Sequence, residues 1–166
     1  MTAEIPLTHG LVALVDDEDY ERVVAAGKWQ AYPSRDTFYA KRSVKRPDGV
    51  WRLIPLHTFL TGYDLTDHHN GNGLDNRRDN LRPATHAENM RNRALQRNNT
   101  SGFKGVNWHS RSRKWKAQIR TNGSKRHVGM FGTPEEAARA YDEAAREFHG
   151  EFATVNFPVP GERGAR

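Results

Sequence analysis

The sequence predicts an α+β fold arranged as two successive domains. The first observation behind this prediction is a set of short strand-like segments, broken by helical ones, before residue 90. The second is a hairpin pattern followed by one long amphipathic helix after residue 98. The length of 166 residues permits one medium domain or two small ones, and the 36% of hydrophobic residues implies small cores.

Charge and composition narrow the function classes. A net charge of +6 favours a polyanionic partner. The absence of cysteine excludes structural disulfides and Cys-ligated zinc. No apolar run approaches the roughly 20 residues of a membrane span, and residues 1–10 lack the pattern of a signal peptide. A soluble cytoplasmic protein is therefore expected.

The first part of the chain is predicted to contain strands and two helices. Asp16 is expected to be the N-cap of an acidic helix that ends at Gly27, and the acids favour its N-terminal end. A short helix over residues 56–60 carries His57, and residues 47–49 form a turn. Four segments have the composition of strands: 10–15, 28–32, 37–45 and 50–54.

The most informative residues lie in the polar segment after this helix. Asp67 and His68 are followed by a Gly/Asn-rich stretch, by Asn80 and then by Asn89. Carboxylate and amide oxygens suit a hard cation such as Mg²⁺. An imidazole can take a proton from water near neutral pH. These residue types suit hydrolysis of a phosphodiester.

A turn-rich surface loop without chemistry is the alternative for this segment. Gly71, Gly73 and the asparagines of this segment are expected in left-handed conformations under either interpretation. Thr85 and Glu88 have the spacing of a capping box, which starts a helix at once and places Asn89 in its first turn. Because a plain loop does not explain this helix start, we prefer an organised site.

The pattern resembles the catalytic motif of the HNH nucleases, in which two short strands, a long loop and a helix hold one divalent metal (the ββα-metal fold). The resemblance implies that His68 is the general base and that Asp67 and Asn89 bind one Mg²⁺ or Mn²⁺. It also implies that Asn80 fixes the loop through backbone hydrogen bonds. His69 is the rival base, but in a strand its side chain would point to the opposite face.

Several basic residues near the motif have two interpretations each. Arg77, Arg78 and Arg82 are candidate phosphate contacts or ordinary surface arginines. His57 either organises the site or is a half-buried helix histidine. The segment 92–102 begins as a helix end and becomes a basic polar linker, which lies along DNA or is simply solvated.

A cationic sheet is predicted after residue 98. Residues 98–132 contain eight Lys and Arg but no Asp or Glu. Apolar and cationic residues alternate between Lys114 and Arg120, so one sheet face is apolar and the other cationic. Asn122 and Gly123 signal a hairpin turn. Three antiparallel strands follow, over about 103–108, 115–120 and 125–131.

One helix is predicted to cover the apolar face of this sheet. Thr133 is its N-cap, Pro134 its first residue and Glu136 completes a capping box. An apolar stripe at helical spacing follows, and Gly150 ends the helix. The second domain is therefore a three-stranded antiparallel sheet packed on one helix.

This second domain closely resembles the plant ethylene-response-factor (Apetala-two) type of DNA-binding domain over nearly all of residues 99–158. The matching segments are 103–106, 115–120, 129–133, 135–142 and 156–158. The resemblance implies that the sheet lies in the major groove of double-stranded DNA. The implied base-facing positions are Asn107, His109, Gln118, Arg120, Lys125 and His127. Lys116 is expected to face the same way.

The plant target sequence does not transfer, because this face departs from the plant pattern. Asn107 and His109 stand where plant domains have Arg, Gln118 stands where they have Glu, and His127 stands where they have Trp.

The combination resembles homing-type HNH endonucleases of phages and mobile elements. Its implied parts are a nuclease domain with a β-rich extension over 1–97, the DNA-binding domain over 98–158 and a tail over 159–166. We expect a monomeric, metal-dependent DNA endonuclease that nicks one strand in a bacterial or phage-infected host. A DNA-binding regulator with a vestigial nuclease half is the main alternative. An RNA-directed activity is less favoured, because the RNA major groove is too narrow to read.

Overall fold

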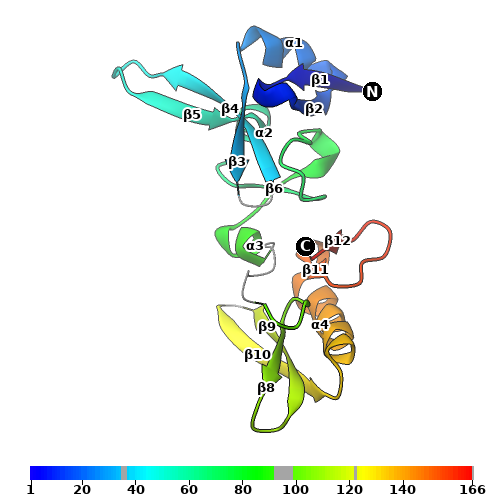
Figure 1. Cartoon of the computed structure of the whole chain (residues 1–166). Coiled ribbons are helices and arrows are strands. Elements are labelled where there is room, and N and C mark those ends of the chain that lie inside the picture. The colour runs from blue at the N-terminus through cyan, green and yellow to red at the C-terminus, as the bar shows by residue number, and fades with distance from the viewer. Residues whose placement is uncertain (35–36, 92–98, 122, 166) are drawn as a thin grey trace. The chain divides into compact units, whose positions relative to one another are not determined.

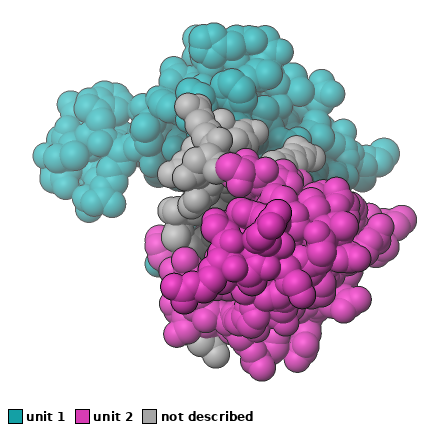
Figure 2. All heavy atoms as spheres, turned by 60° about the horizontal axis from the view of Figure 1, so that its bottom comes forward, with its two compact units in different colours: residues 1–85 teal, residues 86–166 magenta. Residues whose placement is uncertain are grey.

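The computed structural model describes residues 1–34, 37–91, 99–121 and 123–165. The chain divides into two compact units, Met1–Thr85 and His86–Arg166, each with its own hydrophobic core (Figure 2). The domain boundary was predicted after residue 97, whereas helix α3 (His86–Arg91) belongs to the second unit. The predicted linker over 92–98 lies outside the described residues.

The first unit consists of small antiparallel sheets and short helices (Figure 1). Its helices are α1 (Asp17–Ala25) and α2 (Leu56–Thr61), with 3₁₀ turns η1 (Thr8–Gly10) and η2 (Arg78–Asn80). The strand order is β1-β2, β3-β4-β5 and β6-β7. The strands are β1 (Thr2–Pro6), β2 (Val12–Asp16), β3 (Gln30–Ser34), β4 (Thr37–Lys45), β5 (Trp51–Pro55), β6 (Thr66–His68) and β7 (Leu81–Pro83).

Apolar residues from distant elements form the core of this unit. Val15 of β2 and Val23 of α1 pack with Trp29, Leu56 and Leu60. The Trp29 indole N–H donates to the Val23 carbonyl at 2.9 Å, so the large ring is buried without an unsatisfied donor. Strand β1 was not predicted, because it offers only Ile5 as a buried residue and therefore carries a weak pattern.

Helix α1 begins directly after the predicted N-cap, but Asp16 does not cap it. The Asp16 side chain makes no capping hydrogen bond, and its Oδ2 accepts from the backbone N–H of Arg78 at 2.8 Å. The capping prediction was wrong because a donor distant in sequence takes the carboxylate. Gly27 follows the helix with φ of 109°, consistent with the predicted stop.

The second unit contains the predicted sheet and its covering helix. The strands β8 (Val106–His109), β9 (Lys114–Thr121) and β10 (Ser124–Phe131) are antiparallel, and their order is β10-β9-β8. Helix α4 (Pro134–His149) packs on β9 with Ala138 and Tyr141 in the core. The three-stranded sheet on one helix is therefore confirmed.

The helix ends agree with prediction, whereas one strand end does not. Thr133 and Glu136 form a full capping box at the start of α4, and Gly150 follows its end. Strand β8 starts at Val106 and not near 103, because Gly102 and Gly105 turn the chain with positive φ. The predicted turn at 122–123 includes Asn122, which lies outside the described residues.

The C-terminal segment is packed and is not a free tail. After η3 (Gly150–Phe152), strand β11 (Thr154–Val155) pairs in parallel with β12 (Arg163–Gly164). Arg146 of α4 holds this segment with two ion-pair contacts to Glu162, at 2.6 and 2.9 Å. The described part of the chain includes no helix that is both long and apolar enough to span a bilayer.

Candidate nucleic-acid interface and polar loop

The polar loop of the first unit lies between β6 and β7, whose strands pair antiparallel. Backbone hydrogen bonds attach it to β2: Leu14 N–H donates to Leu74, and Asn76 N–H donates to Leu14, both at 2.8 Å. Helix α3 then begins at His86, directly after the predicted N-cap Thr85. The strand, loop, strand and helix therefore follow one another along the chain, and the HNH resemblance stays a prediction.

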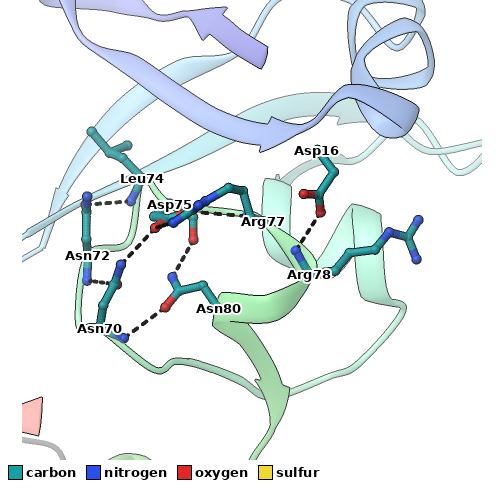
Figure 3. A network of polar contacts seen from close by, with 8 residues as sticks. All are labelled: Asp16, Asn70, Asn72, Leu74, Asp75, Arg77, Arg78 and Asn80. Atoms are coloured by element: carbon teal, nitrogen blue, oxygen red, sulfur yellow. Dashed lines mark hydrogen bonds and ion pairs between the residues drawn. The ribbon is translucent and has the colours of Figure 1, made fainter. Parts of the chain in front are cut away.

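Asn80 fixes the shape of this loop. Its Nδ2 donates to the Asp75 carbonyl at 2.7 Å, and its Oδ1 accepts from the Asn70 N–H at 2.9 Å (Figure 3). The side chain is buried, so these bonds join the start and the middle of the loop to its end, away from water. The expected backbone bonding of Asn80 is thus present, and its role in catalysis stays a prediction.

The turn residues of the loop act differently from the expectation. Gly71 has φ of 76°, but Gly73 and the described asparagines do not have positive φ. The asparagine side chains instead make local turns, since Asn70 accepts from the Asn72 N–H at 2.8 Å and Asn72 from the Leu74 N–H at 3.1 Å. Gly73 lets the loop backbone lie close to β4, because a Cβ at this position would be 2.6 Å from the Tyr39 ring.

His68 is buried at the base of the loop among polar and aromatic neighbours. It is 4% exposed, and its Nε2 lies 3.4 Å from Asn76 Oδ1. Its ring centroid lies 5.1 Å from that of His57 and 5.6 Å from that of Tyr39. His57 therefore touches the predicted base, as one of its two interpretations required.

Burial shapes the chemistry of this cluster. Desolvation, followed by His68 and then Lys41, lowers the pKa of His57 to about 3, so its ring is neutral at physiological pH. His57 Nδ1 and Asn76 Nδ2 are buried and have no hydrogen-bond partner among the described residues. Neither Asn76 nor Tyr39 was predicted to belong to the site. Asn76 lies inside the motif, whereas Tyr39 carries no local signal in the sequence.

Asp67 and His68 face opposite sides of strand β6, as consecutive strand residues must. Asp67 is paired in register with Arg82 of β7, whose Nε and Nη2 donate to Asp67 Oδ2 at 3.1 and 2.8 Å. His69 is half-buried, and its N–H donates to the Asn80 carbonyl at 2.8 Å. Asn89 is half-buried in α3 of the second unit, so its sharing of a metal with Asp67 stays a prediction.

The other two predicted phosphate contacts near the loop are also bound to carboxylates. Arg77 makes a bidentate pair with Asp75, with both contacts at 2.8 Å, and this pair lowers the pKa of Asp75. Arg78 binds the buried Asp19 at 2.9 and 2.8 Å and also pairs with Glu18 at 3.0 Å. With Arg82 on Asp67, this geometry supports a bracing role for all three arginines, and their contact with DNA stays a prediction.

The second unit presents the predicted polar sheet face. Directly opposite residues of an antiparallel pair lie on the same face, and the register pairs Asn107 with Lys116, Gln118 with His127 and Arg120 with Lys125. Ala117 and Ile119, between them on β9, are buried on the other side against α4. All seven predicted positions share one face: Asn107, His109, Lys116, Gln118, Arg120, Lys125 and His127.

His109 has a defined hydrogen-bonding direction at the edge of this face. The Ser112 N–H donates to His109 Nδ1 at 3.3 Å, and Ser112 Oγ lies 2.7 Å from the same atom. Because a backbone N–H can only donate, Nδ1 is the acceptor of the neutral ring and Nε2 carries the proton. His109 therefore offers a donor to an acceptor such as guanine N7 or O6.

Buried polar bonds hold the sheet from behind. Asp142 of α4 is 2% exposed and accepts from Asn156 N–H and Nδ2 at 2.7 and 3.0 Å. Asn156 Oδ1 in turn accepts from the Lys104 N–H at 2.6 Å, and burial lowers the Lys104 pKa to about 8. His149 Nε2 lies 3.0 Å from the Arg120 carbonyl. These contacts fix the strand backbones that carry the polar face.

Comparisons with known proteins agree with this geometry. Residues 101–151 match the AP2 domain, which confirms the resemblance of the second domain. The chain is 36% identical to Protein 3.8 of Escherichia phage T7 over 92 residues, which is 55% of this chain and 74% of that protein.

Plant proteins also match part of the chain. The ethylene-responsive transcription factor ERF084 of Arabidopsis thaliana is 51% identical over 63 residues, 37% of this chain and 24% of that protein. The dehydration-responsive element-binding protein 2A of the same plant is 42% identical over 74 residues, 42% of this chain and 21% of that protein. The chain thus spans about three quarters of the phage protein but a quarter or less of these plant proteins. None of these names bears on the nuclease prediction.

Proposed function

The chain belongs to the family of Protein 3.8 of Escherichia phage T7, and from this premise and its AP2 domain we propose that it binds double-stranded DNA through the β8–β9–β10 sheet. The polar face of that sheet carries the proposal. Lys116, Arg120 and Lys125 supply positive charge there, and the described residues offer them no ion-pair partner. Two plant relatives are named as a transcription factor and as an element-binding protein, which supports DNA as the ligand.

The face divides naturally into groups that read bases and groups that bind phosphate. The major groove is about 12 Å wide and admits a two-stranded β-ribbon. Arg120 is suited to guanine O6 and N7, and Gln118 to adenine N6 and N7, because each makes two hydrogen bonds to one base. Lys125 lies beside Arg120 and Lys116 beside Asn107 in the register, where flexible cations reach the flanking phosphates.

Selection of bound sites from a random DNA library by the full-length protein tests this proposal. We expect one enriched sequence, and Arg120→Ala should relax the preference at a single base pair by about 1–3 kcal/mol. If the wild type enriches nothing and binds no DNA at low salt, the proposal is wrong.

A second candidate function, metal-dependent hydrolysis of DNA phosphodiesters, is favoured by one observation. The loop braced by Asn80 places Asn76 against His68, on a strand paired with β7. In this proposal His68 accepts a proton from water, Asn80 keeps the loop in shape, and the His57 ring and Asn76 limit the movement of the His68 ring.

The residues present suit a single hard cation. Asp67 and Asn89 offer one carboxylate and one amide oxygen, the ligand types of Mg²⁺ and Mn²⁺. When bound, such an ion would stabilise charge on the scissile phosphate and the leaving oxygen. Arg82 already binds Asp67 Oδ2 and therefore competes with a cation for one of the carboxylate oxygens. Among the described residues no three His, Asp or Glu side chains are grouped as metal ligands.

The occupied carboxylate also favours the rival proposal, a DNA-binding regulatory protein whose loop no longer cuts. DNA binding is the part that the comparisons support, and both proposals share it. Incubation of supercoiled plasmid with the protein, with and without Mg²⁺ or Mn²⁺, separates them. Open circles that appear only with metal support the nuclease. A protein that binds the plasmid but leaves it supercoiled across metals and sequences is the regulator.

A further inference from the structure

One face of the β3–β4–β5 sheet is turned away from the core of the first unit. The register places Lys41 opposite Gln30 and Pro55, Ser43 opposite Leu53, and Lys45 opposite Trp51. The intervening residues of β4 point the other way: Ala40 is buried in the core, and Arg42 lies over the Trp29 ring and donates to the Ala26 carbonyl. We call the first side the outer face, made by Tyr32, Tyr39, Lys41, Ser43, Lys45, Trp51 and Leu53.

The outer face combines cations with exposed apolar groups. Trp51 is 65% exposed and Leu53 47%, and they lie in neighbouring rows of the hairpin that stands away from the rest of the first unit (Figure 1). Lys45 is exposed beside Trp51, and Lys41 Nζ lies 5.7 Å from the Tyr32 ring. The described residues of this face include no Asp or Glu. A single exposed apolar residue is common on protein surfaces, whereas a cluster of exposed aromatic and aliphatic side chains marks a binding surface.

The outer face leads directly to the polar loop. Tyr39 lies on it two residues before Lys41, and its ring centroid is 5.6 Å from that of His68. Gly73 of the loop packs against the same ring, and its N–H donates to Thr37 Oγ1 at 3.0 Å. A ligand that lies along β4 therefore meets Tyr39, the ring that packs against the buried His68, without leaving the first unit.

We propose that the outer face is a second contact surface for double-stranded DNA, which holds the phosphate backbone beside His68 while the AP2 sheet reads the bases. This proposal rests on the proposed DNA binding but assigns a separate surface. Charge complementarity selects the ligand: Lys41 and Lys45 lie roughly 13 Å apart along the strand, so each neutralises a different phosphate of a strand that carries one per about 3.4 Å. Trp51 and Leu53 then pack against the sugars between these phosphates.

The test compares variants of the full-length protein that lose the same charge from different faces. The outer-face variant is Lys41→Gln/Lys45→Gln. The matched control is Lys28→Gln/Arg52→Gln, in which Arg52 lies opposite Val44 on the other side of the same hairpin and Lys28 precedes β3. DNA affinity is measured by fluorescence anisotropy from low to moderate salt, after thermal melts have shown that both variants are as stable as the wild type.

We expect the outer-face variant to reduce the slope of log affinity against log salt by about 2, roughly 0.9 for each lost phosphate contact. Its hydroxyl-radical footprint should also shorten on one side, while the control leaves slope and footprint unchanged. Trp51→Ala should weaken binding with little change in slope, because it removes no charge.

Three outcomes separate the ways in which the proposal can fail. If Arg120→Ala changes binding but the outer-face variant behaves like its control, the second surface is wrong and the proposed function stands. If no variant affects DNA binding, because the wild type binds none, the proposed function fails first. If Trp51→Ala changes the mass measured by light scattering but not DNA affinity, the outer face joins two copies of the chain and the proposal is overturned.

Discussion

The two units use their cations in different ways. Around the loop of the first unit, Arg77, Arg78 and Arg82 each bind a carboxylate at 2.8 Å, and two of those carboxylates belong to Asp75 and Asp67. On the AP2 sheet of the second unit, the cations of the polar face make no ion pair with any described residue. The sequence makes all of them equal candidates for phosphate contact. The structure separates arginines that hold the protein together from cations that remain available to a ligand.

This comparison also explains how the units divide the work. The sheet of the second unit is backed by one helix and stiffened by buried bonds from Asp142 and Asn156, which suits a surface that must match a groove. The loop of the first unit is braced from within by Asn80 and from β2 and α1 by polar contacts, which suits a site that must hold one histidine in place. We therefore expect a substitution in one unit to impair that unit and leave the other intact.

The largest effect is expected from His68→Ala, which separates the two units by function. Loss of a general base lowers a rate by roughly 10²–10⁴, so plasmid nicking should almost vanish. DNA affinity should stay within a factor of about two to three, because the AP2 sheet is untouched. Initial nicking rates and anisotropy on the same preparations measure both. His69→Ala is the control and should do much less harm. If His69→Ala is the more damaging change, the base is His69 and not His68.

The next largest effect concerns the stability of the second unit. Gly105 has φ of 75°, and an added Cβ would lie 2.1 Å from the Tyr141 ring. Gly105→Ala therefore combines backbone strain with overpacking and should lower the unfolding free energy of this unit by roughly 2–5 kcal/mol. Urea unfolding followed by circular dichroism measures the loss.

Gly123→Ala serves as the matched control for Gly105→Ala. It has nearly the same φ, 77°, but nothing lies near its Cβ position. It should cost only the strain, about 1–2 kcal/mol. Equal losses for the two variants would show that contact with Tyr141 does not limit residue 105.

The third prediction separates the units by pH. Burial holds the pKa of His57 at about 3 in the folded protein, far below its ordinary value of 6.5. As the pH falls from 6.5 toward 3, His57 therefore becomes protonated in the unfolded chain but stays neutral in the folded chain. Stability of the first unit should fall in that window by up to about 1.4 kcal/mol per pH unit. His57→Phe should flatten this dependence. An unchanged slope in thermal melts between pH 7 and 5 would contradict the assignment.

The second unit was largely predictable because its information is local. The alternation between Lys114 and Arg120 gave β9 and both its faces, and Thr133 with Glu136 gave the start of α4. Side chains repeat every two residues along a strand and every 3.6 residues along a helix, so each face is either buried or exposed. The hydrophobic pattern of such a segment can therefore be recognised in the sequence. Within the three-stranded sheet only the start of β8 was misplaced, because Gly102 and Gly105 turn the chain with positive φ.

The first unit was less predictable because its contacts join residues far apart in the sequence. Arg78 binds Asp19, which precedes it by 59 positions, and takes the side chain of Asp16 away from the helix end. Tyr39 reaches His68 from another sheet. The bonding of Asn80 was the exception, because both its partners lie within the loop itself. No local pattern contains the other contacts, so the motif revealed the residue types but not their surroundings.

The smallest expected effect comes from removing one cation from each unit. Arg120→Gln removes an unpaired cation from the polar face, and Arg78→Gln removes one that is already bound to Asp19. If each available cation neutralises one phosphate, Arg120→Gln should reduce the salt slope of DNA affinity by about 0.9. Arg78→Gln should leave that slope nearly unchanged, since its charge is already balanced by carboxylates, and should instead lower the melting temperature of the first unit. Anisotropy titrations at several salt concentrations and thermal melts of both variants measure the two quantities. A reduced salt slope for Arg78→Gln at wild-type stability would mean that this arginine leaves Asp19 when DNA binds, and that ion pairing in the free protein does not mark a cation as structural.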